Sequence, residues 1–177
     1  MDRRRYAALY GPTAGDRIRL ADTSLFARVE RDDNLPGSEV LTGFGRPVRD
    51  GMFAARQPGP SKLDLLISNV VVLDPVLGIV KTNVGVKDGR IAGIGRAGNP
   101  DVTDGIELVI SNSTGIINGD GLIATPGGVD SHVHLSSTSL IPAALTSGLT
   151  TLVAQGSGGV WDLGVNPEAN LRHLFEA

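Results

Sequence analysis

Two histidines separated by a single residue have the clearest chemical potential in this sequence. His132 and His134 fall near the end of a predicted strand at 129–135. Side chains along a strand alternate between its two faces, so Asp130 is expected on the face of both histidines and Val133 on the opposite face. Two imidazoles placed in this way can bind one zinc, nickel, iron or copper ion, and a third histidine or a carboxylate usually completes such a site.

The residues before the histidines favour this metal-site interpretation. Asp130 can orient one imidazole by accepting a hydrogen bond from its second ring nitrogen, a common arrangement at metal sites. The run Thr-Pro-Gly-Gly at 125–128 predicts a turn that places the pair at the mouth of a βα unit, where such folds keep their active sites. The competing interpretation is a chance His-x-His on a half-exposed strand.

The elements that must position the pair alternate between strand and helix. In chain order they are a strand at 129–135, a helix at 141–146 that ends at Gly148, a strand at 150–153, a loop at 156–165 and a helix at 169–175. Strand, helix, strand and helix in this order are the start of a parallel βα array.

The preceding region, residues 62–125, is expected to consist of strands without a sustained helix. The predicted strands lie at 63–73, 79–86, 91–94, 116–117 and 122–123. Asp88-Gly89 is typical of a tight hairpin turn between the second and third of them. Short strands at this spacing predict a small antiparallel sandwich or an open barrel.

The first 60 residues are polar, with short hydrophobic pieces at 6–9, 18–20 and 25–29. The basic run at 3–5 is interpreted as a solvated first helical turn. The segment at 56–61 contains two prolines and a glycine and is interpreted as a linker. We therefore expect three parts: an N-terminal segment at 1–60, a β-rich composite domain at 61–125, and the start of a barrel at 126–177.

Composition narrows the class of protein. A net charge of −3, a pI near 5.5 and a mean hydropathy of +0.06 indicate a soluble globular chain without the charge footprint of a nucleic-acid or membrane-surface binder. The absence of cysteine excludes disulfides and thiolate metal sites. No apolar run is long enough for a membrane span or a signal peptide, so the cytoplasm is the expected location.

Several segments resemble a known family. The run GGVDSHVH at 127–134 resembles the first metal-binding strand of the amidohydrolase superfamily. Within that superfamily, the runs YGPTAGDRIRLADT at 10–23, VRDGM at 48–52, GVKDGRI at 85–91 and GIGRAGNP at 93–100 are similar to the urease alpha subunit. The similarity stays in register from about residue 5 to residue 151.

This resemblance implies a fold and a chemistry. The fold class is α/β with a large β component: a β-rich, sandwich-like composite domain followed by the first βα units of an incomplete (β/α)8 barrel. The implied site holds two nickel ions bridged by a carbamylated lysine, where a metal-bound hydroxide hydrolyses urea to ammonia and carbamate. His132 and His134 match the two histidines that bind one nickel, and no other residue here matches a family ligand.

Other features predict that the isolated chain is not a competent enzyme. A barrel of this kind needs roughly 250 residues, whereas about 50 follow Pro126. The last lysine is Lys87, and the one remaining histidine, His173, is interpreted as a surface residue on a helix. The runs at 136–139 and 154–161 also depart from the family pattern, in loops that serve catalysis.

Three hypotheses follow for the isolated chain. It is a non-catalytic urease-like assembly or interaction protein; or it is half of an enzyme completed in trans by a complementary barrel polypeptide; or it is a small protein that binds nickel or zinc between copies. Missing barrel strands would leave an apolar surface, so a homo-oligomer or a complex with urease-like subunits is expected. The residues expected on this surface are Leu135, Leu140, Ile141, Leu149 and Leu152.

Overall fold

The computed structural model of the 177-residue chain describes residues 1–37, 54–55, 62–134 and 139–154. The chain divides into two compact units, Met1–Thr125 and Pro126–Ala177. The predicted linker at 56–61, the loop at 156–165 and the helix at 169–175 with His173 lie outside the described residues. The division of the sequence into 1–60, 61–125 and 126–177 stays a prediction.

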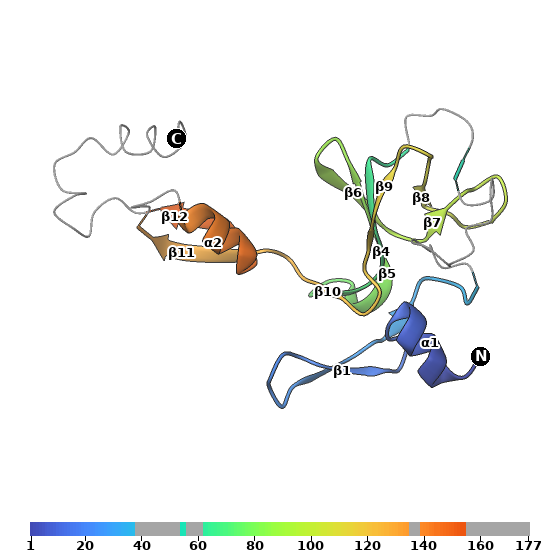
Figure 1. Ribbon diagram of the computed structural model, residues 1–177, viewed down its shortest axis with the longest axis horizontal. Helices are drawn as coiled ribbons and strands as arrows, with labels where there is room; N and C mark the ends of the chain where they lie inside the picture. The colour runs from blue at the N-terminus through green and yellow to red at the C-terminus, as the bar shows by residue number, and fades with distance from the viewer. Residues whose placement is uncertain (38–53, 56–61, 135–138, 155–177) are drawn as a thin grey trace. The chain divides into compact units, whose positions relative to one another are not determined.

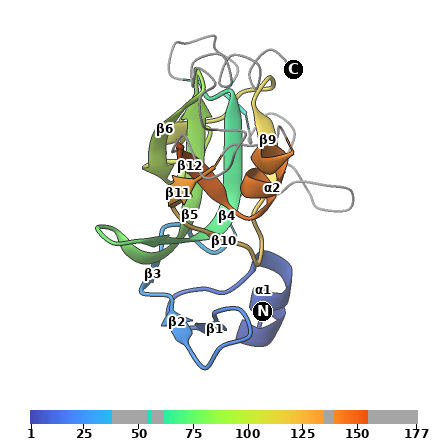
Figure 2. The same ribbon diagram turned by 90° about the vertical axis from the view of Figure 1, so that its left-hand side faces the viewer.

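Two long antiparallel strands form the centre of the first unit. Strand β4 (Leu65–Asp74) pairs with β5 (Gly78–Lys87) along its whole length, and the two lie side by side in Figure 2. The turn between them is closed by the Asp74 carboxylate, which accepts hydrogen bonds from two backbone N–H groups. Both strands are buried almost continuously, which is typical of a sheet covered on both faces.

Short strands extend this pair into a six-stranded sheet. Strand β6 (Arg90–Gly95) follows β5 through a turn at Asp88 and Gly89, whose φ angles of 50° and 71° fit the predicted hairpin. The other short strands are β3 (Arg31–Asp32) on β5, and β9 (Gly115–Asn118) and β10 (Ile123–Ala124) on β4.

These last three strands run parallel to their partners. The expectation of an antiparallel arrangement, made for residues 62–125, is therefore wrong for β9 and β10, while β3 lies in the N-terminal segment outside that range. None of the three is joined to its partner by a hairpin, and a hairpin is what imposes antiparallel pairing on neighbouring strands. The strand-rich region is therefore a mixed sheet. It contains no helix within its described residues, as expected.

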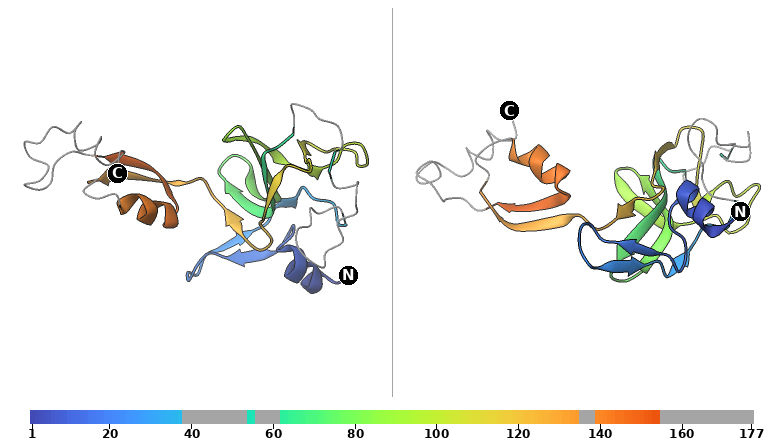
Figure 3. Two further views of the ribbon diagram at one scale, coloured as in Figure 1. Left: turned by 45° about the horizontal axis from the view of Figure 1, so that its top comes forward. Right: turned by 60° about the horizontal axis from the view of Figure 1, so that its bottom comes forward.

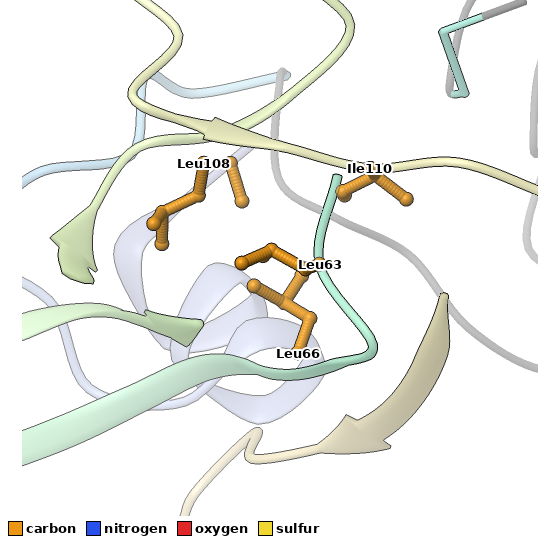
Figure 4. Packing of buried hydrophobic residues seen from close by; sticks show 5 residues of the cluster. Leu63, Leu66, Leu108 and Ile110 are labelled. Carbon is orange, nitrogen blue, oxygen red and sulfur yellow. The ribbon is translucent and has the colours of Figure 1, made fainter. Parts of the chain in front are cut away.

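Two hydrophobic clusters stabilise the sheet. The larger one comprises Leu63, Leu66, Ala97, Leu108 and Ile110, and four of its side chains point toward one another in Figure 4. Leu108 lies on β8 (Leu108–Val109), which pairs with β7 (Ala97–Gly98). The second cluster comprises Val70, Val72 and Val84 from β4 and β5. Both clusters thus lie within the segment 62–125, which was predicted to form the β-rich domain.

The N-terminal segment forms a helix and a two-stranded ribbon, drawn in blue in Figures 1 and 3. Helix α1 (Arg3–Tyr10) begins with three exposed arginines, as predicted, and the Asp2 carboxylate accepts a hydrogen bond from the Arg5 backbone N–H. Strand β1 (Arg17–Arg19) pairs antiparallel with β2 (Phe26–Arg28).

A buried lysine joins this segment to the sheet. The Lys81 side chain is fully buried, and its ammonium lies 3.7 Å from the Asp32 carboxylate and 4.7 Å from the centre of the Tyr6 ring. Nearby, the Asn83 side chain donates to Asn34 at 2.9 Å. Sequence analysis missed this cluster, although a lysine between Val80 and Thr82 in an aliphatic strand was the available signal.

The second unit is a strand–helix–strand arrangement. Strand β11 (Gly128–Val133), helix α2 (Leu140–Thr146) and β12 (Leu149–Ala154) match the predicted order and lie beside one another in Figure 1. The two strands pair in parallel, which confirms the expected βα unit. Among the described residues, no helix is long and apolar enough to cross a bilayer.

Candidate functional site

Glycine allows β11 and β12 to approach closely at the start of the second unit. A Cβ atom on Gly127 would overlap the Thr150 side chain, and one on Gly128 would lie 2.9 Å from Leu149 Cδ2. Gly148, with φ of 81°, ends α2 and turns the chain into β12. Gly127 and Gly128 therefore allow β11, the strand that contains His132, to pack closely against β12.

Strand β11 contains a bulge between Asp130 and Val133, in the segment that includes His132. Asp130 pairs with Leu152 and Val133 with Ala154, so three steps along β11 are matched by two along β12. One extra residue on β11 interrupts the strict alternation of side chains. The prediction that Asp130 shares a face with both histidines required an unbroken strand. The bulge removes the basis for that prediction.

The two imidazoles nevertheless meet. The Nε2 atoms of His132 and His134 lie 3.1 Å apart, and the rings are 5.1 Å apart between centroids at 63°. His132 is exposed and His134 is half-buried. His134 follows the last residue of β11, so the pair lies at the carboxyl end of a parallel strand, the end at which α/β folds place their ligands.

The distance between the two nitrogens fits two ligands of one ion. Imidazole nitrogens about 2.0–2.1 Å from a shared ion are separated by about 2.9 Å at a right angle and about 3.4 Å at the tetrahedral angle. The observed 3.1 Å lies between these values. In the part of the chain that the structure describes, no group of three or more His, Cys, Asp or Glu side chains is placed to hold a metal. The pair is thus a partial donor set.

Asp130 has a different partner from the one expected. Its Oδ1 accepts a hydrogen bond of 3.0 Å from the backbone N–H of His132, two residues further along the chain. His134 Nδ1 is buried and has no hydrogen-bond partner among the described residues. The hydrogen bond from an imidazole to Asp130 stays a prediction, while the structure shows the carboxylate fixing the backbone that leads into His132.

The exposed apolar residues of this unit differ from the set expected. Leu140, Ile141, Leu149 and Leu152 are half-buried, and Leu135 lies outside the described residues. The large exposed side chains are instead Val129 at 62%, Leu145 at 62% and Val153 at 46%. The apolar surface is therefore formed by other residues of the same three elements.

Comparison with known proteins shows which family this chain is similar to. Residues 1–117 match the family model described as "Urease alpha-subunit, N-terminal domain". The chain is 49% identical over 172 residues to "Urease subunit alpha 2" of Streptomyces coelicolor, covering 97% of this chain and 31% of that protein.

Two archaeal proteins are similarly related. "Urease subunit alpha" of Haloarcula marismortui is 47% identical over 181 residues, covering 100% of this chain and 32% of the relative. The protein of the same name from Natronomonas pharaonis is 52% identical over 165 residues, covering 90% of this chain and 29% of the relative. The chain thus spans about a third of the length of the curated relatives it matches.

Proposed function

Because the chain belongs to the urease alpha-subunit family, we propose that it contributes two histidine ligands to a nickel-dependent, urea-hydrolysing site. His132 and His134 bind one metal ion through their Nε2 atoms. Nickel is the ion implied by the family resemblance, and zinc is the alternative that the same donors accept. The bound ions would act as Lewis acids and lower the pKa of the attacking water.

The observation that supports this proposal is the 3.1 Å approach of the two Nε2 atoms at the carboxyl end of β11. Without a metal, the same separation allows a hydrogen bond between the two rings, so the metal-free chain already holds the two nitrogens at a spacing that one ion can bridge. Asp130 supports the arrangement by holding the His132 backbone. The buried His134 Nδ1 has no partner among the described residues, so the acceptor that usually fixes the tautomer of a metal-bound histidine would come from outside them.

The isolated 177-residue chain is proposed to be inactive toward urea. A two-metal site needs further ligands and a bridging group, whereas this sequence offers no lysine beyond Lys87 to provide a carbamate. The missing donors come from polypeptide outside these 177 residues, which extends the parallel βα array begun by β11 and β12. A complementary barrel polypeptide acting in trans would supply them.

The test measures nickel binding and ammonia release with the same protein. Isothermal titration of the 177-residue chain with nickel chloride should show saturable binding, and a His132→Ala, His134→Ala double variant should bind at least about tenfold more weakly. His173→Ala is the matched control, because this histidine is not expected to be a ligand. Urea hydrolysis in the presence of nickel and bicarbonate should equal that of the double variant.

Two results would contradict the proposal. Equal nickel affinity of the parent and the double variant would show that His132 and His134 do not bind the metal. Ammonia release that depends on both histidines, from protein shown by mass spectrometry to be free of a second polypeptide, would show that the chain is competent alone.

A second candidate is a urease-like assembly or interaction protein without turnover. The exposed apolar side chains of Val129, Leu145 and Val153 favour it, because a partner that covers them would remove apolar surface from water. The two candidates differ in what the loss of both histidines would do. An assembly protein would still bind its partner, whereas the metal site proposed above would no longer bind nickel.

A further inference from the structure

The exposed face of the β1–β2 ribbon carries an unusual charge pairing. Arg17 and Arg28 are directly opposite each other across the two strands, and Arg19 is opposite Phe26. These four exposed residues, here called the arginine face, point away from the buried Ala27 on the other side of the ribbon. Like charges placed directly opposite each other destabilise a strand pair, so this arrangement needs a compensating partner.

The acidic residues close in sequence do not provide that compensation. Asp16 binds Arg3 at 2.6 Å, and Asp22 binds Arg19 at 3.0 Å. The Glu30 carboxylate is directed at Gly78, where a Cβ atom would lie 2.6 Å from its Oε2. Arg28 makes no hydrogen bond or ion pair with any residue that the structure describes, and the same holds for Arg17.

Arg17 is nevertheless held in position. Its guanidinium carbon lies 4.8 Å from the centre of the Phe26 ring. The ring attracts the cation without accepting hydrogen bonds from all five guanidinium N–H groups, so donors stay available for an anion. Phe26 remains 51% exposed, so an apolar surface lies next to the two unpaired cations.

We propose that the arginine face binds an acidic, extended segment of a partner protein, with a carboxylate held between Arg17 and Arg28. Guanidinium and carboxylate form bidentate, charge-assisted hydrogen bonds, and Phe26 packs against the apolar part of the same segment. A polyanion is a poorer fit, because the ribbon strands are only three residues long and offer few cations along their length. This proposal does not depend on urea hydrolysis.

The test follows the arginine side chains by NMR in the full 177-residue chain. The probe is the peptide acetyl-Gly-Glu-Tyr-Glu-Gly-amide, and its control is the analogue with glutamine in place of both glutamates. The acidic peptide should shift the Nε–Hε resonances of Arg17 and Arg28 saturably, and the glutamine analogue should not. Inorganic phosphate and heparin, added separately, should each bind more weakly than the acidic peptide.

Substitutions separate binding from a structural role. Arg28→Gln should weaken peptide binding at least about threefold, and Arg28→Glu at least about tenfold. Arg28→Glu should at the same time raise the melting temperature, because the new carboxylate lies opposite Arg17. Arg90→Gln, which removes an exposed arginine from β6, should leave peptide binding unchanged.

Four outcomes would overturn the proposal. They are the absence of saturable shifts at Arg17 and Arg28, an equal response to the glutamine peptide, unchanged affinity in a folded Arg28→Gln variant, and tighter binding of phosphate or heparin than of the acidic peptide. The last outcome would assign the face to a phosphate- or sulfate-bearing ligand.

Discussion

Lys81 is a fully buried cation whose partners come from the N-terminal segment. Removing one member of a buried ion pair leaves the other without compensation, which usually costs several kcal/mol. We predict that Lys81→Met lowers the free energy of unfolding by about 3 kcal/mol, measured by guanidinium chloride denaturation.

The matched control is Lys87→Met on the same strand. Lys87 is 31% exposed and lies 3.9 Å from Asp64, so the variant should lose less than about 1 kcal/mol. Similar losses in the two variants would mean that burial of the Lys81 ion pair contributes little to stability.

The Asp16 carboxyl makes the stability of the folded chain depend on pH. Burial raises the pKa of its carboxyl, but the hydrogen bond from the Thr13 backbone N–H and the ion pair with Arg3 outweigh burial and hold the pKa below its ordinary value. A carboxyl with a lowered pKa in the folded state stabilises the protein above its unfolded pKa, near pH 4, and this contribution is lost as the pH falls through the folded pKa.

We therefore predict that Asp16→Asn is less stable than the parent at pH 7 and loses less stability between pH 4 and pH 2. Denaturation midpoints across this range measure both effects. Asp74, whose pKa is lowered by hydrogen bonds from the backbone N–H groups of Leu77 and Val76, keeps part of the acid sensitivity in the variant. Identical acid slopes for the parent and the variant would contradict the role of Asp16.

At the scale of elements, the turn between β9 and β10 depends on a close backbone approach. A Cβ atom on Gly119 would lie 2.5 Å from the Ser68 carbonyl oxygen and 2.8 Å from Val70 Cβ, both on β4. We predict that Gly119→Ala costs about 2 kcal/mol, because the turn must move away from β4. Chemical denaturation gives the cost.

Gly89→Ala is the comparison in the β5–β6 turn. Nothing lies within 4 Å of its added Cβ, but the φ angle of 71° is strained for alanine. This variant should cost about 1 kcal/mol. If Gly119→Ala cost less than Gly89→Ala, β9 and β10 would not be packed as tightly on β4 as the structure places them.

At the scale of the whole molecule, the exposed side chains of the second unit predict self-association. A Val129→Thr, Leu145→Gln, Val153→Thr triple variant should shift the chain toward the monomer in light scattering, because it removes apolar surface that favours contact. Val76→Thr is the control, since Val76 is 90% exposed in the β4–β5 turn of the first unit. A parent chain that stayed monomeric without binding a hydrophobic dye would refute this prediction.

Local sequence patterns were enough to predict most of the strands and helices of this protein. Runs rich in Val, Leu and Ile predicted β4, β5 and β6, Asp88-Gly89 predicted the hairpin between β5 and β6, and Gly148 predicted the end of α2, because these signals act over a few residues. The spacing of His132 and His134 likewise predicted that the two imidazoles would lie close together. The family resemblance identified nickel as the ion that this pair is expected to bind.

The pairing of strands and the partners of side chains could not be predicted from local patterns and became visible in the folded chain. The parallel pairing of β3, β9 and β10, the burial of Lys81 against Asp32, and the bulge in β11 opposite β12 all depend on contacts between distant segments. Local patterns predict that a segment is a strand, but each backbone donor and acceptor takes the partner that the whole fold brings within reach.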